Sequence, residues 1–427
     1  MKRNDFPSIG ETCFEERLEN GLLIRVIPKK DFARKYAFIA VDFGSIDTAF
    51  TVNGEKHRVP DGIAHYLEHK MFDLPDENAM NLFAMQGGSP NAFTSYAMTA
   101  YYFSCTEHFD ENLRTLLRMV MTPYFTPESV EKERGIIAQE IKMYEDSADS
   151  RVYEDLFDAL YAEHPVRVPI AGTVESIADI TAQTLYDCYE NFYQPSNMIL
   201  CVTGDVDAQK VIDAARELTG KNRAQIPERD YGREEVMRPV RPQIERRMEV
   251  SMPMFSVGFK CEAPQDGAQS MLQEFIGDLA AEILIGESSP LYQRLYEQGL
   301  IDAGFSAGYE SVKNACQISA GGDSRDPDAV VSAMLEEAER IAREGFDPEL
   351  FERLKKSSIG RRTRDLDSFE SICYRNCAYY FEGSDYFRFP ERYAEATPQA
   401  VQEFLNRVIR PERCAVSKIL PKEQEGV

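Results

Sequence analysis

The sequence predicts two similar domains, each built of both strands and helices. Its 427 residues exceed one ordinary domain and fit two domains of about 200 residues each. A charged and proline-rich stretch interrupts the apolar patterning near the middle, and the strand and helix patterns start again after it. We therefore expect an N-terminal domain over residues 1–220, a linker over residues 221–248 and a C-terminal domain over residues 249–427.

Strand patterns open the first domain, and helical patterns fill its middle. The runs "GLLIRVIPKK" and "YAFIAVDFGSID" have the β-branched and aromatic residues of strands, and "PNAFTSYAMTAYYFSCT" alternates like one or two more. A helix is expected from about Asp61 to Phe72 and further helices from roughly Glu107 to Glu163. Another buried strand is expected in "NMILCVTGDVD".

The second domain repeats this order in a diverged form. "MPMFSVGFKCEA" is typical of a strand, and "SMLQEFIGDLAAEILIG" is typical of a helix of the same order and length as the first one. The second helix carries Asp278 and Glu282 but no histidine. A metal site, if the chain has one, is therefore expected in the first domain alone.

Charge and cysteine usage exclude several classes of protein. The formal net charge of −24 argues against a nucleic-acid partner, because a phosphate backbone needs a basic surface. Simple solubility or an acidic cavity for basic peptides remains as an explanation, and solubility is favoured. Nine cysteines are an odd number, which rules out a complete disulfide framework. Cys373 and Cys377 are interpreted as core residues of a helix rather than metal ligands.

No targeting segment is evident in the sequence. The first 20 residues lack the apolar run of a secretory signal. No window approaches the ~20 apolar residues that a membrane span needs. We expect a cytoplasmic protein without a membrane or nucleic-acid partner.

Two histidines four residues apart carry the first chemical signal, in "VPDGIAHYLEHKMFD" at residues 59–73. On a helix, His65 and His69 lie ~40° apart on one face, and Glu68 lies ~60° from His65 on its other side. Two such imidazoles can chelate one ion, and the carboxylate can poise a water molecule. The order His-x-x-Glu-His reverses the commoner zinc-peptidase motif.

A third ligand is predicted from a second helix, "TPESVEKERGIIAQEIKMYED". A catalytic zinc site usually takes three protein ligands. Glu133 and Glu140 fall within the apolar arc centred on Ile137, and a buried carboxylate without a cation is costly. We predict Glu140 as the third ligand and Glu133 as its supporting neighbour. The other members of that arc are Val130, Ile136, Ile141 and Tyr144.

The two histidines can also be interpreted as structural residues that bind no metal. One His-x-x-Glu-His can arise by chance, and core histidines are usually only hydrogen-bonded. The two acids on a second apolar face favour the metal site. The remaining histidines, His57, His108 and His164, lack such company and are expected to be surface or packing residues.

With these residues the chain resembles the M16 family of zinc peptidases. "HYLEH", "NAFTS", the Glu-x6-Glu helix and "HPVRVPIAGTVESI" carry the resemblance, which is strongest from Val59 to about Met198. It implies an α+β fold of the M16/LuxS-like metallohydrolase type, with two similar domains, each a mostly antiparallel sheet with helices packed on it. It also implies one Zn²⁺ per chain on His65, His69 and Glu140, with Glu68 as general base and Glu133 as supporting acid.

The resemblance extends to substrate and partners. It implies that a peptide adds as a strand at an edge around Asn91, Ala92 and Phe93. Phe93 and Phe72 are either an apolar side-chain pocket or core residues. Two such chains would close like a clam shell around a chamber. More narrowly, the motifs are similar to a bacterial branch named for its association with the 5-aminopentanol modification of elongation factor P.

One departure from the family concerns an Arg and a Tyr, seven residues apart, that hold the substrate carbonyl. The expected arginine position here reads Tyr296, and the tyrosine region reads Ala303-Gly304-Phe305. Arg294 is close, but Ile301 stands seven residues after it. We therefore expect a second M16-like subunit to donate the pair, in a heterodimer, with a homodimer as the alternative.

The function predicted from the sequence is a zinc-dependent metalloendopeptidase that hydrolyses peptides or small unfolded proteins in a closed chamber. One alternative is a structural, chaperone-like or maturation subunit with little activity of its own. Another is a zinc-dependent lyase or a regulatory metal-binding module, which would share the ligands. The lyase or regulatory module would not need Glu68 as a base.

Overall fold

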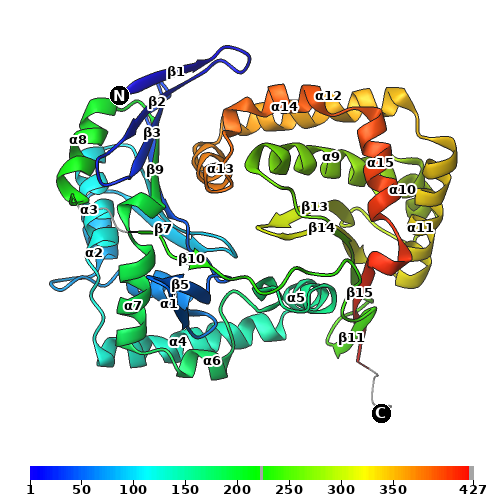
Figure 1. The fold of residues 1–427 in the computed structure, drawn as a ribbon, viewed down its shortest axis with the longest axis horizontal. Helices are drawn as coiled ribbons and strands as arrows, with labels where there is room; N and C mark the ends of the chain where they lie inside the picture. The colour runs from blue at the N-terminus through cyan, green and yellow to red at the C-terminus, as the bar shows by residue number, and fades with distance from the viewer. Residues whose placement is uncertain (222–224, 423–427) are drawn as a thin grey trace.

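Two β-sheets, one in each half of the chain, form the framework of the molecule (Figure 1). The structure is a computed structural model and describes residues 1–221 and 225–422. The first sheet has the strand order β1-β2-β3-β9-β4-β8-β7 and the second the order β11-β15-β12-β14-β13. All neighbours are antiparallel except β3 with β9 and β11 with β15. The strands of the first sheet are β1 (Lys2–Phe6), β2 (Glu11–Arg17), β3 (Leu23–Pro28), β4 (Lys35–Val41), β7 (Ser89–Thr94), β8 (Thr99–Cys105) and β9 (Met198–Gly204). Those of the second are β11 (Gln243–Met248), β12 (Met254–Cys261), β13 (Ser306–Val312), β14 (Ala315–Asp323) and β15 (Cys414–Pro421).

The helices follow the strands in the same order in both halves. The first half contains α1 (Ile63–Lys70), α2 (Ala79–Met85), the hairpin of β7 and β8, α3 (Phe109–Met121), α4 (Pro127–Asp146), α5 (Ala148–Leu160), α6 (Val174–Ala178), α7 (Ala182–Phe192), β9 and α8 (Ala208–Leu218). The second contains α9 (Gly267–Ile285), α10 (Pro290–Glu297), the hairpin of β13 and β14, α11 (Pro327–Glu344), α12 (Pro348–Asp365), α13 (Phe369–Phe381), α14 (Phe389–Glu395), α15 (Pro398–Val408) and β15. The predicted α+β class with two similar halves is confirmed. By this order, α9 and α12 are the counterparts of α1 and α4.

Most of the predicted elements are present, and two hairpins are additions to those predicted in the first half. The expected strands correspond to β3, β4, β7, β8, β9 and β12, and the expected helix near the histidines is α1. The sequence prediction missed the hairpin of β1 and β2. It also missed a small sheet of β5 (Ala49–Val52), β6 (Glu55–Arg58) and β10 (Glu228–Arg229). All four residues of β6 are exposed, and an exposed strand needs no apolar alternation.

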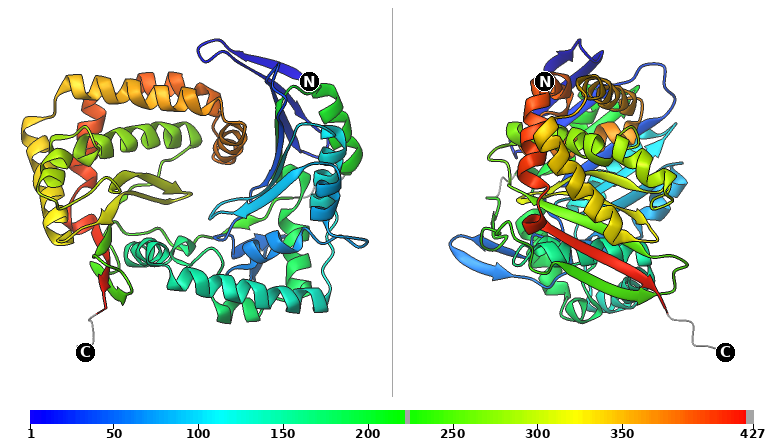
Figure 2. Two further views of the ribbon diagram at one scale, coloured as in Figure 1. Left: turned by 180° about the vertical axis from the view of Figure 1, so that it is seen from behind. Right: turned by 90° about the vertical axis from the view of Figure 1, so that its right-hand side faces the viewer.

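The two halves exchange helices across the middle of the molecule. Helix α5 of the first half packs on β12 and β15 of the second sheet, and α13 of the second half packs on β4 and β9 of the first (Figures 1 and 2). Gly258 allows the first contact, because a Cβ there would lie 2.7 Å from Leu160 Cδ1. Cys373 and Cys377 are fully buried on α13, and Cys373 Sγ donates to the Cys201 carbonyl at 3.6 Å. The prediction that this cysteine pair packs in a core is confirmed.

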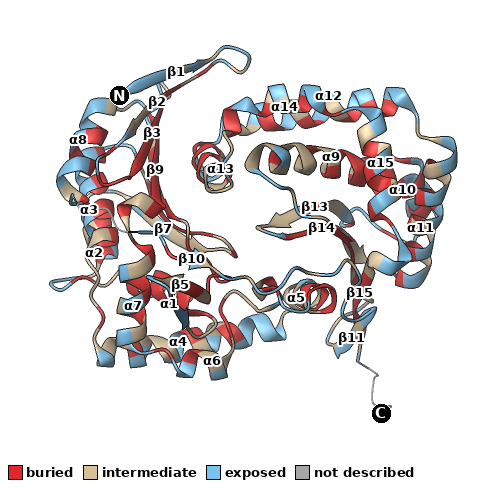
Figure 3. Ribbon diagram, in the orientation of Figure 1, coloured by how far each residue is buried: buried red, intermediate tan, exposed pale blue. Residues whose placement is uncertain are grey.

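The first sheet is therefore covered on both faces (Figure 3). One face packs against its own helices, with Leu67, Leu116 and Ile137 in that core. The other face shares a core with the second half, in which Phe38 belongs to the same cluster as Phe255 and Cys373. None of the helices in the described part of the chain combines the length and apolar character that crossing a bilayer requires.

The stretch predicted as a linker adds one strand to the small sheet and one strand to the second sheet. Near its start, β10 pairs with β5, and at its end β11 pairs with β15 in parallel. Most residues of β11 are exposed, which explains why the stretch lacks apolar periodicity. Residues 222–224 lie outside the described residues. The domain boundaries at 220 and 248 stay a prediction.

Glu235 anchors this stretch to the end of α5. Its Oε1 accepts the backbone N–H groups of Ala162 at 2.9 Å, Glu163 at 2.7 Å and His164 at 2.9 Å. Its Oε2 accepts the Lys260 ammonium at 3.0 Å, and Lys260 is 1% exposed. Burial alone would raise the pKa of Glu235, but these donors lower it to about 2.

We expect Glu235→Gln to reduce the free energy of unfolding at neutral pH by about 2 kcal/mol, because it leaves a buried ammonium without its anion. A lowered folded-state pKa stabilises the fold above the usual value of 4.5, and that contribution disappears as pH falls toward about 2. Urea unfolding from pH 7 to pH 2.5 should show the gap between wild type and variant closing at low pH. The exposed neighbour gives the control Glu234→Gln, which should change little. A gap that does not depend on pH would contradict this role.

Candidate metal centre and active site

The start of α1 is fixed against the loop of residues 169–173. Gly62, with φ 89°, precedes the helix, and a Cβ there would lie 2.4 Å from the Ala171 carbonyl oxygen. Gly172, with φ 73°, approaches the Asp61 carbonyl oxygen in the same way, where a Cβ would lie at 2.5 Å. Only glycine combines the positive φ with this close approach. The loop from "HPVRVPIAGTVESI" thus lies directly beside the histidine helix.

Helix α4 begins where the sequence predicts it. Thr126 caps it in a capping box with Ser129, and Pro127 stands at its first position. Tyr66 of α1 donates a hydrogen bond to the Val130 carbonyl and joins the two helices. Val130, Ile137 and Ile141 are buried, and this face sets the rotation of the helix.

Part of the predicted apolar arc on α4 was wrong. Ile136 is 49% exposed and Tyr144 is 40% exposed. Helix α4 packs against α1, α5 and α6. The buried stripe is narrower than expected and consists of Val130, Ile137 and Ile141. Glu133 and Glu140 lie at its edge, half-buried, where they face the histidines.

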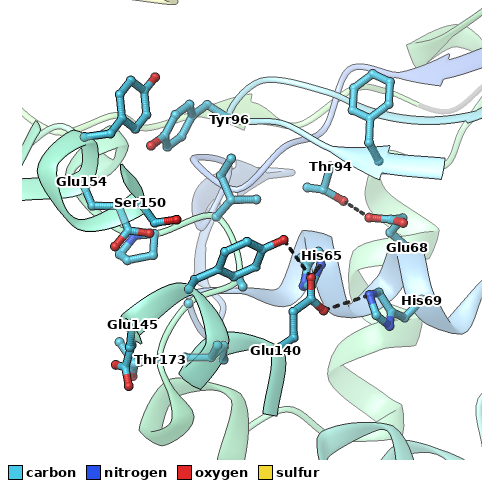
Figure 4. Close-up of a pocket in the computed structure, with 18 of the residues that line it drawn as sticks. His65, Glu68, His69, Thr94, Tyr96, Glu140, Glu145, Ser150, Glu154 and Thr173 are labelled. Atoms are coloured by element: carbon cyan, nitrogen blue, oxygen red, sulfur yellow. Dashed lines mark hydrogen bonds and ion pairs between the residues drawn. The ribbon is translucent and has the colours of Figure 1, made fainter. Parts of the chain in front are cut away.

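Glu140 reaches both predicted histidine ligands with its two carboxylate oxygens (Figure 4). Glu140 Oε1 lies 3.6 Å from His65 Nε2, and Glu140 Oε2 lies 3.6 Å from His69 Nε2. One ligand atom from each of the three residues falls within 4.8 Å of the others. Among the described residues, this is the one group of three or more histidines, cysteines or acids that could hold a metal ion. Two imidazole nitrogens and one carboxylate oxygen fit Zn²⁺.

Neighbouring polar groups hold two of these three side chains. Glu133 Oε1 lies 2.9 Å from His69 Nδ1, on the side of the ring away from Glu140. Burial lowers the pKa of His69, but Glu133 and the nearby acids outweigh it, so that the pKa is raised. The Tyr144 hydroxyl donates to Glu140 Oε1 at 3.1 Å. The pKa of Glu140 is lowered, and the interaction with the neighbouring His65 ring is the first cause. His65 Nδ1 is buried and has no hydrogen-bond partner among the described residues.

Glu68 lies beside this group, and one of its carboxylate oxygens accepts a hydrogen bond. The Thr94 hydroxyl donates to Glu68 Oε2 at 2.8 Å (Figure 4). Glu68 is 8% exposed, and burial raises its pKa. The sequence prediction included "NAFTS" but gave Thr94 no role. The missing signal is tertiary, since β7 must lie over α1 before the two residues meet.

The group opens into a cleft of about 450 Å³. Its walls come from α1, β7, α4, α5 and the loop of residues 169–173; the lining residues are His65, Glu68, His69, Ala92, Phe93, Thr94, Tyr96, Glu140, Ile141, Tyr144, Glu145, Ser150, Arg151, Tyr153, Glu154, Pro169, Ile170, Ala171, Gly172 and Thr173. Ala92 and Phe93, predicted to bind substrate, are among them, whereas Asn91 is not. Strand β7 is an edge of the first sheet.

The interpretation of Phe72 and Phe93 as one apolar pocket does not hold. Phe72 packs against Tyr101, with ring centroids 6.2 Å apart. Phe93 packs against Phe38 at 6.0 Å and lies near Tyr374 of α13 at 5.9 Å. The two rings belong to different cores. Phe93 alone lines the cleft.

The second half has an ion pair where the first half has its histidines. Glu274 and Asp278 lie one turn apart on α9, and both face Arg362 of α12. Arg362 Nη2 lies 2.6 Å from Glu274 Oε1 and 3.5 Å from Asp278 Oδ2. A guanidinium is always charged in a protein and donates in several directions. Arg362 thus pairs with both acids and supplies one positive charge between them.

The remaining predicted positions lie away from the cleft lining. Tyr296, at the expected arginine position, is 52% exposed on α10, and Phe305 is buried. His57 and His108 are exposed, and His164 is buried, where burial lowers its pKa to about 4. The prediction that these three histidines are surface or packing residues is confirmed.

Comparison with known proteins points to one family. The model of the insulinase family (peptidase family M16) matches residues 54–174, and the model described as peptidase M16 inactive domain matches residues 179–358. The chain is 39% identical to the "uncharacterized zinc protease YmfH" of Bacillus subtilis, over 99% of this chain and 100% of that one. A structure described as an M16-like peptidase, from Alicyclobacillus acidocaldarius, matches with a TM-score of 0.92 and 35% identity, over 96% of this chain and 99% of that one. Pitrilysin matches in fold with a TM-score of 0.76 and 20% identity, over 100% of this chain and 46% of pitrilysin.

Proposed function

We propose that this chain, which belongs to the insulinase family of peptidases (family M16), hydrolyses internal peptide bonds with one zinc ion. His65, His69 and Glu140 would hold the ion. The observation that carries the proposal is the meeting of these three side chains within 4.8 Å, beside Glu68, in an open cleft. The name of the Bacillus subtilis relative, a zinc protease, supports the choice of metal.

When bound, zinc polarises a scissile carbonyl and makes an attacking water more acidic. The chain's own residues then manage the proton. Glu68 accepts the proton of the water through the oxygen that Thr94 leaves free, and it later donates that proton to the leaving amine. Glu133 holds the ring of His69 in place.

A substrate would bind along β7. Because β7 is an edge strand next to the metal group, an extended peptide can pair with its backbone and place a carbonyl at the cleft. Asn91, Ala92 and Phe93 are the proposed contacts. Ala92 and Phe93 line the cleft, while Asn91 would act through its backbone alone.

A second M16-like unit would complete the site. Tyr296 stands at the expected arginine position and Ala303-Gly304-Phe305 in the expected tyrosine region, so this chain lacks the family's Arg and Tyr, which supports donation by a partner. Pitrilysin's chain is more than twice as long as the part that this chain matches, and that supports a second unit of similar size. We propose a heterodimer around a closed chamber, with a homodimer as the alternative. The elongation factor P branch and the cytoplasmic location stay predictions.

The test is a digest of a peptide library by the purified chain, alone and together with the protein that it captures from its native cell. We expect cleavage that stops with a chelator and returns with zinc, and much faster cleavage with the partner. Cleavage that persists in the chelator would contradict the metal mechanism. If neither the chain nor the pair cleaves, the structural or chaperone-like function replaces the peptidase.

A further inference from the structure

We propose that Tyr144 is a positioning residue for the metal ligand Glu140, whose one carboxylate oxygen it holds so that the other is left to the metal. The inference rests on the proposed function, because it concerns the same metal site. It adds a residue that the sequence prediction counted only as a member of the apolar arc of α4. It also assigns each oxygen of Glu140 a separate task.

The contact comes from the helix itself. Tyr144 stands four residues after Glu140 on α4, so the two side chains lie on the same face of the helix. The Tyr144 hydroxyl donates to Glu140 Oε1 at 3.1 Å. Tyr144 also lines the cleft, with 40% of its surface exposed. The hydroxyl therefore bonds the ligand side chain at the wall of the open site.

Without this hydrogen bond, nothing in the geometry favours one oxygen of the Glu140 carboxylate over the other for binding the metal ion. Glu140 Oε1 lies 3.6 Å from His65 Nε2, and Glu140 Oε2 lies the same distance from His69 Nε2. A carboxylate placed so evenly can bind an ion through one oxygen or through both. A hydroxyl that donates to Oε1 uses a lone pair of that oxygen. Oε2 is then the better donor to the ion.

The choice between one and two oxygens affects the chemistry of the site. A catalytic zinc site needs three protein ligand atoms and an open position for water or substrate. Binding through both oxygens of Glu140 would fill a further position. Glu133 already fixes His69 in a comparable way, through the ring nitrogen that does not face the site. Tyr144 does for the carboxylate what Glu133 does for the imidazole.

The test uses Tyr144→Phe, which removes the hydroxyl and keeps the ring. Zinc affinity is measured on the metal-free full chain by competition with a chromogenic chelator. We expect binding about 10-fold weaker than wild type, within the ~10–100-fold usual for groups that orient ligands. The Co²⁺-loaded proteins give a second readout. The visible d–d bands of the variant should weaken, because binding through both oxygens raises the coordination number.

Tyr153→Phe is the matched control. Tyr153 lines the same cleft from α5, but its hydroxyl donates to Glu310 at 3.3 Å rather than to a proposed ligand. Its zinc affinity and Co²⁺ bands should equal those of wild type. Equal thermal unfolding of the metal-free proteins would show that neither change acts through the fold.

Each outcome separates the inference from the proposed function. If wild type binds zinc and Tyr144→Phe matches Tyr153→Phe in affinity and in spectrum, the role of Tyr144 is wrong and the peptidase proposal stands. If wild type itself binds no zinc, both are wrong. Weaker zinc binding with altered Co²⁺ bands in Tyr144→Phe alone supports the inference.

Discussion

The variant Glu68→Gln is expected to keep its zinc and to lose peptide hydrolysis by about 10²–10⁴-fold, the usual contribution of a general base. Glutamine has the same shape, and its amide oxygen can still accept the hydrogen bond from Thr94 that holds Glu68 at 2.8 Å. It cannot accept a proton from water. The loss should therefore appear in kcat, with the metal content unchanged. Steady-state kinetics on a peptide from the digest, together with metal analysis of the same sample, measure both.

Glu128→Gln provides the control for this change. Glu128 is an exposed acid in the first turn of α4, away from the cleft lining. The Glu128→Gln variant loses one negative charge, as Glu68→Gln does, and it should retain full activity. If Glu68→Gln turned over as fast as this control, Glu68 would not be the base. A zinc-dependent lyase or a regulatory metal site would then explain the ligands better.

The variant Glu140→Gln is expected to lose most of its affinity for zinc. A neutral amide oxygen is a much poorer ligand than a carboxylate, and two imidazoles alone make an incomplete site. The loss should exceed the ~10–100-fold usual for residues that only orient ligands, and hydrolysis should fall with it. Equilibrium dialysis against buffered zinc measures the affinity.

Glu145→Gln is the matched variant for this experiment. Glu145 lies on the same helix and lines the same cleft, but it pairs with Arg151 at 3.3 Å instead of the histidines. It should bind zinc like wild type. Retention of zinc by Glu140→Gln at wild-type affinity would mean that the third ligand is another residue or a partner's.

The metal group could be predicted from sequence because it depends on two helices. Helical spacing alone places His65 and His69 on one face of α1, and it places Glu133 and Glu140 together on α4. Because burying an unpaired carboxylate is costly, the acidic face of α4 is then expected to meet the histidine face of α1. The residues that complete the site follow no such spacing. Thr94 reaches Glu68 only because β7 lies over α1.

The packing of the two halves against each other could not be predicted from sequence patterns for a similar reason. A buried helix face shows that something covers it and does not show what. The apolar faces of α5 and α13 are equally compatible with packing on their own sheet, yet each packs on the other half's sheet. The edge strands β1, β6 and β11 were missed because they bury few side chains. Tyr144 was placed in the apolar arc by its spacing, although its ring is largely outside the core.

A crystal structure of the Glu68→Gln chain grown with zinc, with diffraction recorded on both sides of the zinc absorption edge, tests the central claim most directly. We expect one anomalous peak per chain, within about 2.0–2.2 Å of His65 Nε2, His69 Nε2 and an oxygen of Glu140. No peak there, or a peak that Glu140 does not touch, would contradict the account.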